Sequence, residues 1–403
     1  MKKFTLITLT TLLINICSTA TFAQSQVDSL NHIPLVKNEI ADDYFGVQFA
    51  LASNHVSKTM RGIQWSFGTN KADEGFNGWQ FALGGNINGG DTKGFQLGLG
   101  YNRADDSIIG SQFGAGFNST SHLKGLQAAV GANIADKAHG VQVGLYNQAE
   151  ELSGVQIGVV NTVLKERSHG LQAAAVNVST SEVLDGIQLG VVNTAKDVEG
   201  LQAGFLNKSD KMDGLSIGFI NVADSLDGLS IAPFSFIKDG IADFELSYSD
   251  NFQYNFSFRS GKEYFYFIWT GGVQNTDDFN RYGLGGGIGT QWNMAHKGLV
   301  KGSFELTHMF VKDDRQIDWG DGQNYLSQGR LNIIVNLAKP ISLVAGPTLN
   351  YSYQSGNWVD KDAPSFTKID PMYEYRQEYE LSDKVTEHKL WLGFHAGIRI
   401  HLY

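Results

Sequence analysis

The sequence has little cysteine, no long apolar run beyond its first residues and a deficit of positive charge. Its single cysteine is Cys17, which excludes a disulfide framework. After residue 23 no apolar run approaches the roughly 18 residues that a membrane helix needs, so only strands are available to cross a membrane. Lys and Arg total 31 against 41 Asp and Glu, and this acidic balance argues against a nucleic-acid partner.

The first 23 residues have the pattern of an export signal. Two lysines precede an apolar run at 4–16, and small residues lead to Ala23. Cys17 follows Asn-Ile, so the small residue that a lipidated cysteine requires before it is missing. We therefore expect cleavage before Gln24, which leaves an exported chain without a thiol. Because two lysines leave with the signal, formal charge falls from -10 to -12. Residues 24–43 then form a polar leader.

One short sequence motif, called a phrase below, is repeated thirteen times between residues 45 and 236. Its clearest copies are GVQIGVVN (Gly154 to Asn161), GIQLGVVN (Gly186 to Asn193) and GLQAGFLN (Gly200 to Asn207). Apolar residues alternate within each copy, and a period of two predicts a β-strand. The copies recur every 14 to 16 residues, with the repeated Gln at 48, 64, 80, 96, 112, 127, 142, 156, 172, 188 and 202 and serine in its place at 216 and 230.

The segments between copies distinguish two architectures. In a membrane barrel successive connections lie at opposite ends, short at one and long at the other. Here NTAKDVEG, NKSDKMDG and NVADSLDG are alike, which predicts a solenoid with one coil per repeat. We expect an Asn ladder at one corner, Gly with left-handed backbone angles at the other and an apolar row inside. The alternative makes the repeats membrane strands of one large pore, with Val and Ile toward lipid and Gly and Gln toward the lumen.

At these residues the chain resembles the short-repeat bacterial surface proteins built from tandem GLQIGLVN-like (GxQxGxxN) units. The resemblance covers the repeat region, although copies before Gly125, such as NGWQFALGGN and IGSQFGAGFN, are looser. It implies a protein of the bacterial cell envelope or surface. Most such families have no assigned activity.

The chain changes character near residue 241, where the alternating segments lengthen and aromatic residues become frequent. Connections after the second, fourth and sixth segments are short, whereas those after the third, fifth and seventh are long. This pattern is typical of an outer-membrane barrel, and one of eight strands has a lumen filled by side chains. The eight segments are 242–248, 252–258, 262–274, 282–292, 298–311, 327–338, 340–354 and 387–402.

Two residues depart from the pattern of a membrane barrel. Such barrels usually end in an aromatic residue on the lipid face, but Tyr403 has the parity of Arg399 on the polar face rather than that of Phe394 on the apolar face. Pro347 falls in mid-strand, where proline is tolerated only at a bulge or an edge. The alternative is a soluble antiparallel sheet that caps the solenoid.

Few side chains suggest chemistry. The loop 312–324 gathers oxygen ligands of the kind that bind calcium, but their spacing fits no EF-hand, and a solvated loop is the better interpretation. Its four aspartates are Asp313, Asp314, Asp318 and Asp321.

Four polar residues, His308, His395, Arg399 and His401, are candidates to line the barrel lumen, where paired polar groups are an ordinary need of a small barrel. A second hypothesis is an outer-membrane hydrolase. It requires a Ser or Asp beside His395 or His401 at the mouth of the lumen, and its signature is loss of activity on His395→Ala.

Other polar positions in the repeats have simpler explanations. His122, His139 and His169 fall in the connections, where we expect exposed corner residues. The Gln and Gly rows offer either a flat surface for a glycan or protein partner, or a simple amide ladder. The glycines of 283–289 continue a strand alternation without a following helix, so we expect small lumen-facing residues rather than a phosphate loop.

The sequence thus predicts an exported all-β protein of the Gram-negative envelope. Its parts are a signal peptide (1–23), a polar leader (24–43), a repeat β-solenoid (44–238) and an eight-stranded antiparallel β-barrel (239–403). We expect a non-enzymatic structural or binding role at the outer membrane or cell surface. Outer-membrane lipid is the expected partner of the barrel, and a glycan or protein that of the repeats or long loops. No catalytic residue, cofactor or metal site is predicted.

Overall fold

The computed structural model describes residues 36–402 apart from 166, 276–279, 296–297, 314–322, 357–366, 368 and 380–383. The described chain is all-β: a solenoid of about 12 turns is followed by a closed antiparallel barrel of eight strands, which confirms the predicted fold class. The chain divides into two compact units, one ending at Lys196 and the other beginning at Asp197. The predicted signal peptide and most of the polar leader lie outside the described residues. Within the described ranges no helix is long and apolar enough to cross a membrane.

Strands of 3 to 32 residues build the solenoid coils of both units. Those of the first unit are β1 (Lys37–Ile40), β2 (Tyr44–Ala50), β3 (Ser53–Val56), β4 (Thr59–Ser66), β5 (Thr69–Ala72), β6 (Gly75–Ala82), β7 (Gly85–Asn88), β8 (Thr92–Gly98), β9 (Tyr101–Gly114), β10 (Phe117–Ala129), β11 (Ala132–Val163), β12 (Arg167–Ser179), β13 (Val183–Leu189) and β14 (Val192–Thr194). Those of the second unit are β15 (Asp197–Ala203), β16 (Leu206–Ile217), β17 (Ile220–Ile231) and β18 (Phe234–Ile237).

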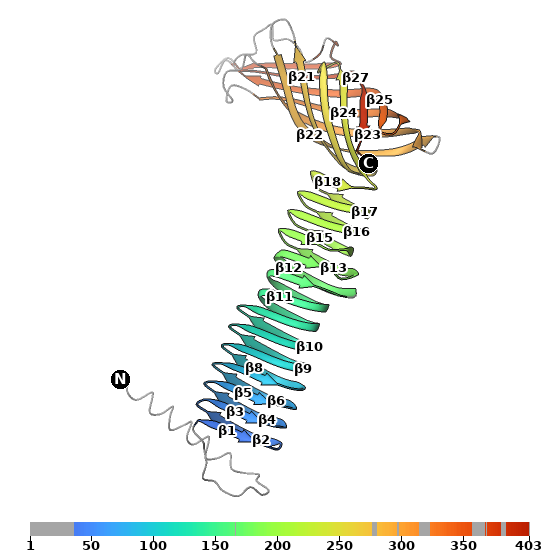
Figure 1. Cartoon of the computed structure of the whole chain (residues 1–403). Helices are drawn as coiled ribbons and strands as arrows, with labels where there is room; N and C mark the ends of the chain where they lie inside the picture. Colours follow the sequence, from blue (N-terminus) through green and yellow to red (C-terminus); the bar gives the residue numbers. More distant parts are fainter. Residues whose placement is uncertain are drawn as a thin grey trace. The chain divides into compact units, whose positions relative to one another are not determined.

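Successive coils stack one on another (Figure 1), pairing as parallel strands in which like residues pair with like. Between β2 and β4, Gly46 pairs with Gly62 and Gln48 pairs with Gln64. Gln64 in turn pairs with Gln80 of β6, one coil further on. This pairing is that of a solenoid, and it differs from the antiparallel ladder of a membrane pore.

The solenoid interior corrects the expectation of an apolar strand row inside. Gln142 is completely buried, whereas Val143 and Leu145 on the same phrase are exposed. The Gln rows are therefore inside, where each amide from Gln64 to Gln188 donates to the Gln of the preceding coil, as Gln64 Nε2 does to Gln48 Oε1 at 2.7 Å. Burial is tolerated because stacked amides satisfy one another.

Apolar residues of the connecting segments complete the interior. In the middle coils they form a cluster of buried side chains that includes Ile108, Leu123 and Leu152. Leu152 stands two residues before Gly154. This position is apolar in every repeat except those with Thr92 and Ser168. The connection thus supplies the apolar core that the strand was expected to supply.

Glycine at the start of eleven of the thirteen repeats has the positive φ that was predicted, the exceptions being Gly140 and Gly154. Gly62 has a φ of 131° and Gly186 one of 158°. A Cβ atom added to Gly62 would lie 2.0 Å from the carbonyl oxygen of Gly46 in the coil below. Only glycine fits this corner, because both the backbone angle and the close approach of the next coil exclude a side chain.

The predicted Asn ladder is present and satisfies backbone groups at the opposite corner. Asn118 Nδ2 donates to Asn133 Oδ1 at 2.9 Å and to Ala128 O at 2.9 Å. Its own Oδ1 accepts from Asn102 Nδ2 at 2.8 Å. The ladder thus ties each coil to the next through side chains as well as through the strands.

Asn118→Ala should lower the free energy of unfolding by about 1–3 kcal/mol, because it leaves buried amide groups of two neighbouring coils unpaired. The urea midpoint of the circular dichroism signal measures this loss. Asn77→Ala is the matched control, since Asn77 is exposed and its truncation should change the midpoint little. Equal effects of the two substitutions would contradict a stabilising ladder.

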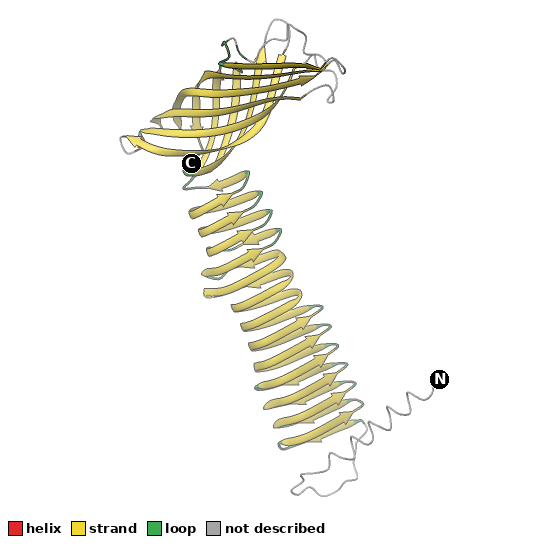
Figure 2. Cartoon of the chain, turned by 180° about the vertical axis from the view of Figure 1, so that it is seen from behind, coloured by secondary structure: helices red, strands yellow, loops and turns green. Residues whose placement is uncertain are grey.

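The barrel is a meander of eight strands, closed where β19 pairs with β27, for example Asp243 with His401. Figure 2 draws the described chain as strands and loops without helices. A short ninth strand, β26, extends the sheet along β27, where Tyr373 pairs with Leu390. The strands are β19 (Ile241–Ser249), β20 (Tyr254–Lys262), β21 (Phe265–Asn275), β22 (Asn280–Ala295), β23 (Val300–Asp313), β24 (Gln323–Ala338), β25 (Ile341–Gly356), β26 (Tyr373–Tyr379) and β27 (Lys384–His401).

Pro347 lies within β25, which is paired on both sides. It sits neither at an edge nor at a bulge, contrary to the expectation. Instead the ladder to β24 is interrupted there: Thr348 pairs with Arg330 and Ala345 with Ile333, without partners in between. Proline has no backbone N–H to donate. Because Pro347 has no partner in β24, the missing N–H breaks no hydrogen bond of that ladder.

Candidate functional site: the outer faces of barrel and repeats

The barrel has its apolar residues outside and its charged residues inside. Leu246 and Leu284 point outward and are 63 % and 71 % exposed, whereas Glu245, Arg259 and Arg399 are completely buried in the lumen. This is the reverse of a water-soluble protein, in which charged groups face the solvent. The outer face therefore matches hydrocarbon.

The strands are long enough to span a bilayer. β19 and β20 have 9 residues each, and β27 has 18, against the roughly 9–11 that a tilted membrane strand needs. Short turns separate β20 from β21 and β24 from β25, while the undescribed segments 314–322 and 357–366 fall in the long connections. The predicted alternation of short and long loops agrees with the strand bounds after β23, β24 and β25, whereas the connections after β21 (276–279) and β22 (296–299) are equal in length.

Aromatic and imidazole rings gather on the outer face toward the long-loop end. His308 stacks on Tyr325 with ring centroids 5.3 Å apart, and Tyr325 stacks on Tyr353 at 5.9 Å. The hydroxyl of Tyr351 lies 2.8 Å from His388 Nδ1. Rings with one apolar and one polar side suit the boundary between hydrocarbon and water. His308 was expected in the lumen. It alternates with Thr307 and Met309, which are buried, and its own side chain therefore points outward.

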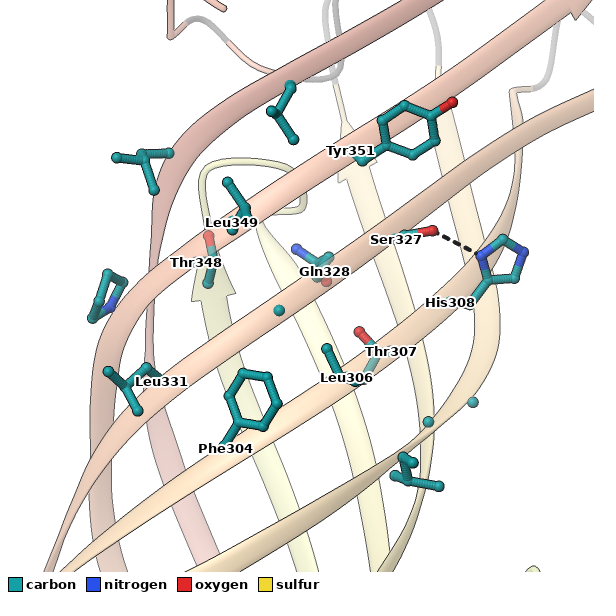
Figure 3. Close-up of a pocket in the computed structure, with 17 residues that line it drawn as sticks. Phe304, Leu306, Thr307, His308, Ser327, Gln328, Leu331, Thr348, Leu349 and Tyr351 are labelled. Carbon is teal, nitrogen blue, oxygen red and sulfur yellow. Dashed lines mark hydrogen bonds between the residues drawn. The ribbon is translucent and has the colours of Figure 1, made fainter. Parts of the chain in front are cut away.

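A shallow depression of about 650 Å³ lies on the outer face beside this group (Figure 3). Phe304, Leu306, Leu331 and Leu349 border it, and Gly329 forms part of its lining. In its lining, Ser327 Oγ lies 2.9 Å from His308 Nδ1. The depression is apolar with one polar pair.

Glu305 is the centre of the ion network inside the barrel. Arg259 donates to it from Nε at 2.7 Å and from Nη2 at 2.8 Å, a bidentate pair. Arg399 Nη2 donates at 3.1 Å and the hydroxyl of Tyr266 at 3.0 Å. Every one of these side chains is buried. The charges are stable there because each is paired within a few ångströms.

Glu245 is the second carboxylate of the ion network in the lumen. His395 Nε2 lies 2.9 Å from Glu245 Oε1, and Arg399 Nη2 lies 2.9 Å from Glu245 Oε2. Arg259 Nη1 approaches the same carboxylate at 3.1 Å. The predicted lumen positions of His395 and Arg399 are thus confirmed. Both residues join β27 to the neighbouring strand β19, and Arg399 also reaches Glu305 of β23 across the lumen.

A Ser–His–Asp arrangement closes the short-turn end of the lumen. His401 Nδ1 lies 2.7 Å from Asp243 Oδ1, and its Nε2 lies 2.6 Å from Ser342 Oγ. These residues line a cavity of about 480 Å³. The hydrolase hypothesis asked for such neighbours beside His395 or His401, and His401 has both.

Ser342 is, however, completely buried, and its hydroxyl donates to Asn336 Oδ1 at 2.6 Å. A nucleophile needs its proton on the histidine side and its oxygen open to a carbonyl. In this arrangement the hydroxyl proton is directed to the amide instead, so the group links β19, β25 and β27.

The remaining sequence candidates are dispersed. Asp313 ends β23, and the other three aspartates of that loop lie outside the described residues. His122, His139 and His169 are exposed, as expected. Gly283 and Gly289 face the lumen, where an added Cβ would strike the rings of Phe252 and Tyr266. Across the described ranges no three His, Cys, Asp or Glu side chains form a group suited to a metal.

The solenoid carries a continuous apolar surface, which we call the apolar face. It consists of the two residues that flank each ladder Gln and the residue three positions after it. Trp65, Leu145 and Ile157 are examples, with 41 %, 56 % and 46 % of their surface exposed. In the first unit every residue of this set is apolar except Ser111. The Gln rows, considered above as a recognition surface, lie beneath it and are buried.

Charged side chains lie instead on the connecting segments. Asp73 accepts from Lys71 Nζ at 2.8 Å and from His55 Nε2 at 2.9 Å. The hydrogen bond from Lys71, followed by that from His55, lowers the pKa of Asp73 below its usual value. The solenoid is thus amphipathic, with charge on one side of the coil and an uncharged apolar face on the other.

Comparison of the chain with models of protein families, with curated proteins and with solved structures finds no match.

Proposed function

We propose that this chain is a non-enzymatic protein of the Gram-negative cell envelope, anchored in the outer membrane by its barrel, with the repeats as a contact surface. The carrying observation is the inverted barrel, in which leucine and phenylalanine face outward while Glu245, Glu305, Arg259 and Arg399 are buried inside. Exposing such an apolar band is unfavourable in water, whereas it is favourable against the hydrocarbon of a bilayer.

Three further observations support an anchor. The eight strands are long enough to span a bilayer, rings with polar edges gather near the long-loop end, and the ion network occupies the lumen. The export pattern of residues 1–23 and the tandem GxQxGxxN units, which resemble bacterial short-repeat surface proteins, agree with this location. Parallel coils with buried Gln favour a contact role for the repeats over membership of one large pore.

The chain enters the barrel at the short-turn end, because β19 begins where β20 and β21 are joined by a tight turn. Outer-membrane barrels have their short turns in the periplasm. The proposal therefore assigns the repeats to the periplasmic side. A role on the cell surface requires the opposite insertion.

Protease protection on intact cells tests this topology. One tag is placed in the repeat connection at Lys208–Met212 and another in the long connection at 357–366 between β25 and β26. We expect cleavage at the long connection alone, and cleavage at both sites only after the outer membrane is opened. The control is the same pair of tags in opened cells, which shows that each site can be cut. Cleavage of the repeat tag in intact cells would refute the periplasmic assignment.

A further inference from the structure

The apolar face of the repeats is larger than a monomeric protein ordinarily exposes. At about 60 Å² each, its exposed large side chains in the first unit present on the order of 1,000 Å² of apolar surface, whereas the largest patch of a typical monomer is roughly 300–600 Å². A stable protein interface buries about 800 Å² per partner. The seventeen side chains are Val47, Leu51, Ile63, Trp65, Phe67, Trp79, Leu83, Leu97, Leu99, Val130, Val143, Leu145, Ile157, Val159, Ile187, Leu189 and Val191.

The shape and chemistry of this face restrict its partner. It is built from in-register parallel strands, so its side chains stand in straight rows one strand spacing apart, roughly 4.8 Å. It carries no charge, and its polar amides are buried below. A partner must therefore be flat, apolar and uncharged over many coils. The same face of a second copy meets each condition, with rows of equal spacing.

The aromatic residues support a protein partner. Phe49 and Trp65 lie with ring centroids 4.6 Å apart, and Trp65 and Phe67 lie 5.6 Å apart, all on this face. Large aromatic side chains dominate the energy of protein interfaces. A bilayer surface is the poorer occupant, because the chain has a net charge of -10 and anionic headgroups repel an acidic protein.

We propose that the apolar face is a homodimer interface, in which the faces of two copies pack as two sheets about 10 Å apart. The rotation that relates two copies is two-fold, since one patch meets the same patch. This inference deepens the contact role proposed for the repeats by naming the partner. It holds whichever side of the membrane the repeats occupy.

Site-specific crosslinking in intact cells tests the interface. Cys17→Ser leaves a chain without thiols, into which single cysteines are placed on the apolar face by Leu97→Cys, Val143→Cys or Leu189→Cys. A bismaleimide that spans about 10 Å should give a covalent dimer. Dimers from all three variants indicate copies aligned in the same direction, and a dimer from one variant locates the crossing point of copies that run in opposite directions.

Arg103→Cys is the matched control, because Arg103 is exposed and lies off the apolar face; it should give at least tenfold less dimer. Leu145→Glu added to Val143→Cys should lower crosslinking at least tenfold, and circular dichroism checks that the coil remains folded. No dimer from any of the three positions would overturn the proposal, as would an adduct with a different protein or contact of a spin label on the Val143→Cys variant with acyl chains. A failed protease-protection result leaves this outcome unaffected, so the two proposals are tested separately.

Discussion

Gly78→Ala is expected to destabilise the solenoid by about 3–5 kcal/mol, among the largest effects of any single substitution in the chain. Gly78 lies in β6 with a φ of 142°, where an L-residue is strained, and its Cβ would lie 1.9 Å from the carbonyl oxygen of Gly62. A backbone atom of the neighbouring coil has to move, and that shift breaks the ladder on both sides. Urea unfolding followed by circular dichroism measures the loss.

Gly75→Ala is the control for this experiment, because it makes the same chemical change three residues earlier in the same strand. Its Cβ would lie 3.2 Å from Asp91 O, which requires a neighbour to move by only a few tenths of an ångström. We expect a loss of about 1 kcal/mol or less. Similar losses at Gly75 and Gly78 would mean that the stacked-glycine corner is not what the coil depends on.

Glu305→Ala is expected to destabilise the barrel by about 3–5 kcal/mol. It removes the carboxylate to which Arg259, Arg399 and Tyr266 donate, and it leaves guanidinium charge in a completely buried lumen. Thermal unfolding of the protein in detergent, followed by circular dichroism, measures the effect. Glu305→Gln should be nearly as damaging, since an amide keeps the shape and loses the charge.

Glu263→Ala provides the comparison for the Glu305 experiment. Glu263 lies at the rim of the barrel, 42 % exposed, and accepts from Lys301 Nζ at 2.7 Å. Water screens this pair, so its loss should cost about 1 kcal/mol or less. If Glu305→Ala proved as mild as Glu263→Ala, the lumen network would not be holding the strands together.

Sequence reasoning could not predict the contacts of His401 with Asp243 and with Ser342. The parity of His401 and Asp243 assigns both to the polar face of their strands. That they are cross-strand neighbours, and that Ser342 completes the group, depends on barrel closure and register. His308 shows the same limit in reverse, because it was grouped with lumen residues by type although its alternation with Thr307 and Met309 places it outside.

The interior of the solenoid is the clearest case in which residue type misled. Val143 and Leu145 read as core and Gln142 as surface, whereas the structure buries Gln142 and exposes the other two. An isolated Gln side chain is costly to bury. In a stack of identical coils every amide has one above and one below it, so the ladder removes that cost.

By itself the sequence determined the repeat length, the parallel coil, the Gly and Asn corners, and the change to an eight-stranded antiparallel barrel. These follow from local spacing and alternation, which a strand or turn expresses wherever it lies. Only the tertiary structure decided which side of each coil faces outward, which strands close the barrel and which charges meet across the lumen. Those outcomes depend on pairing between residues that are one coil apart in the solenoid or more than 150 positions apart in the barrel, as Glu245 and Arg399 are, and no local pattern encodes them.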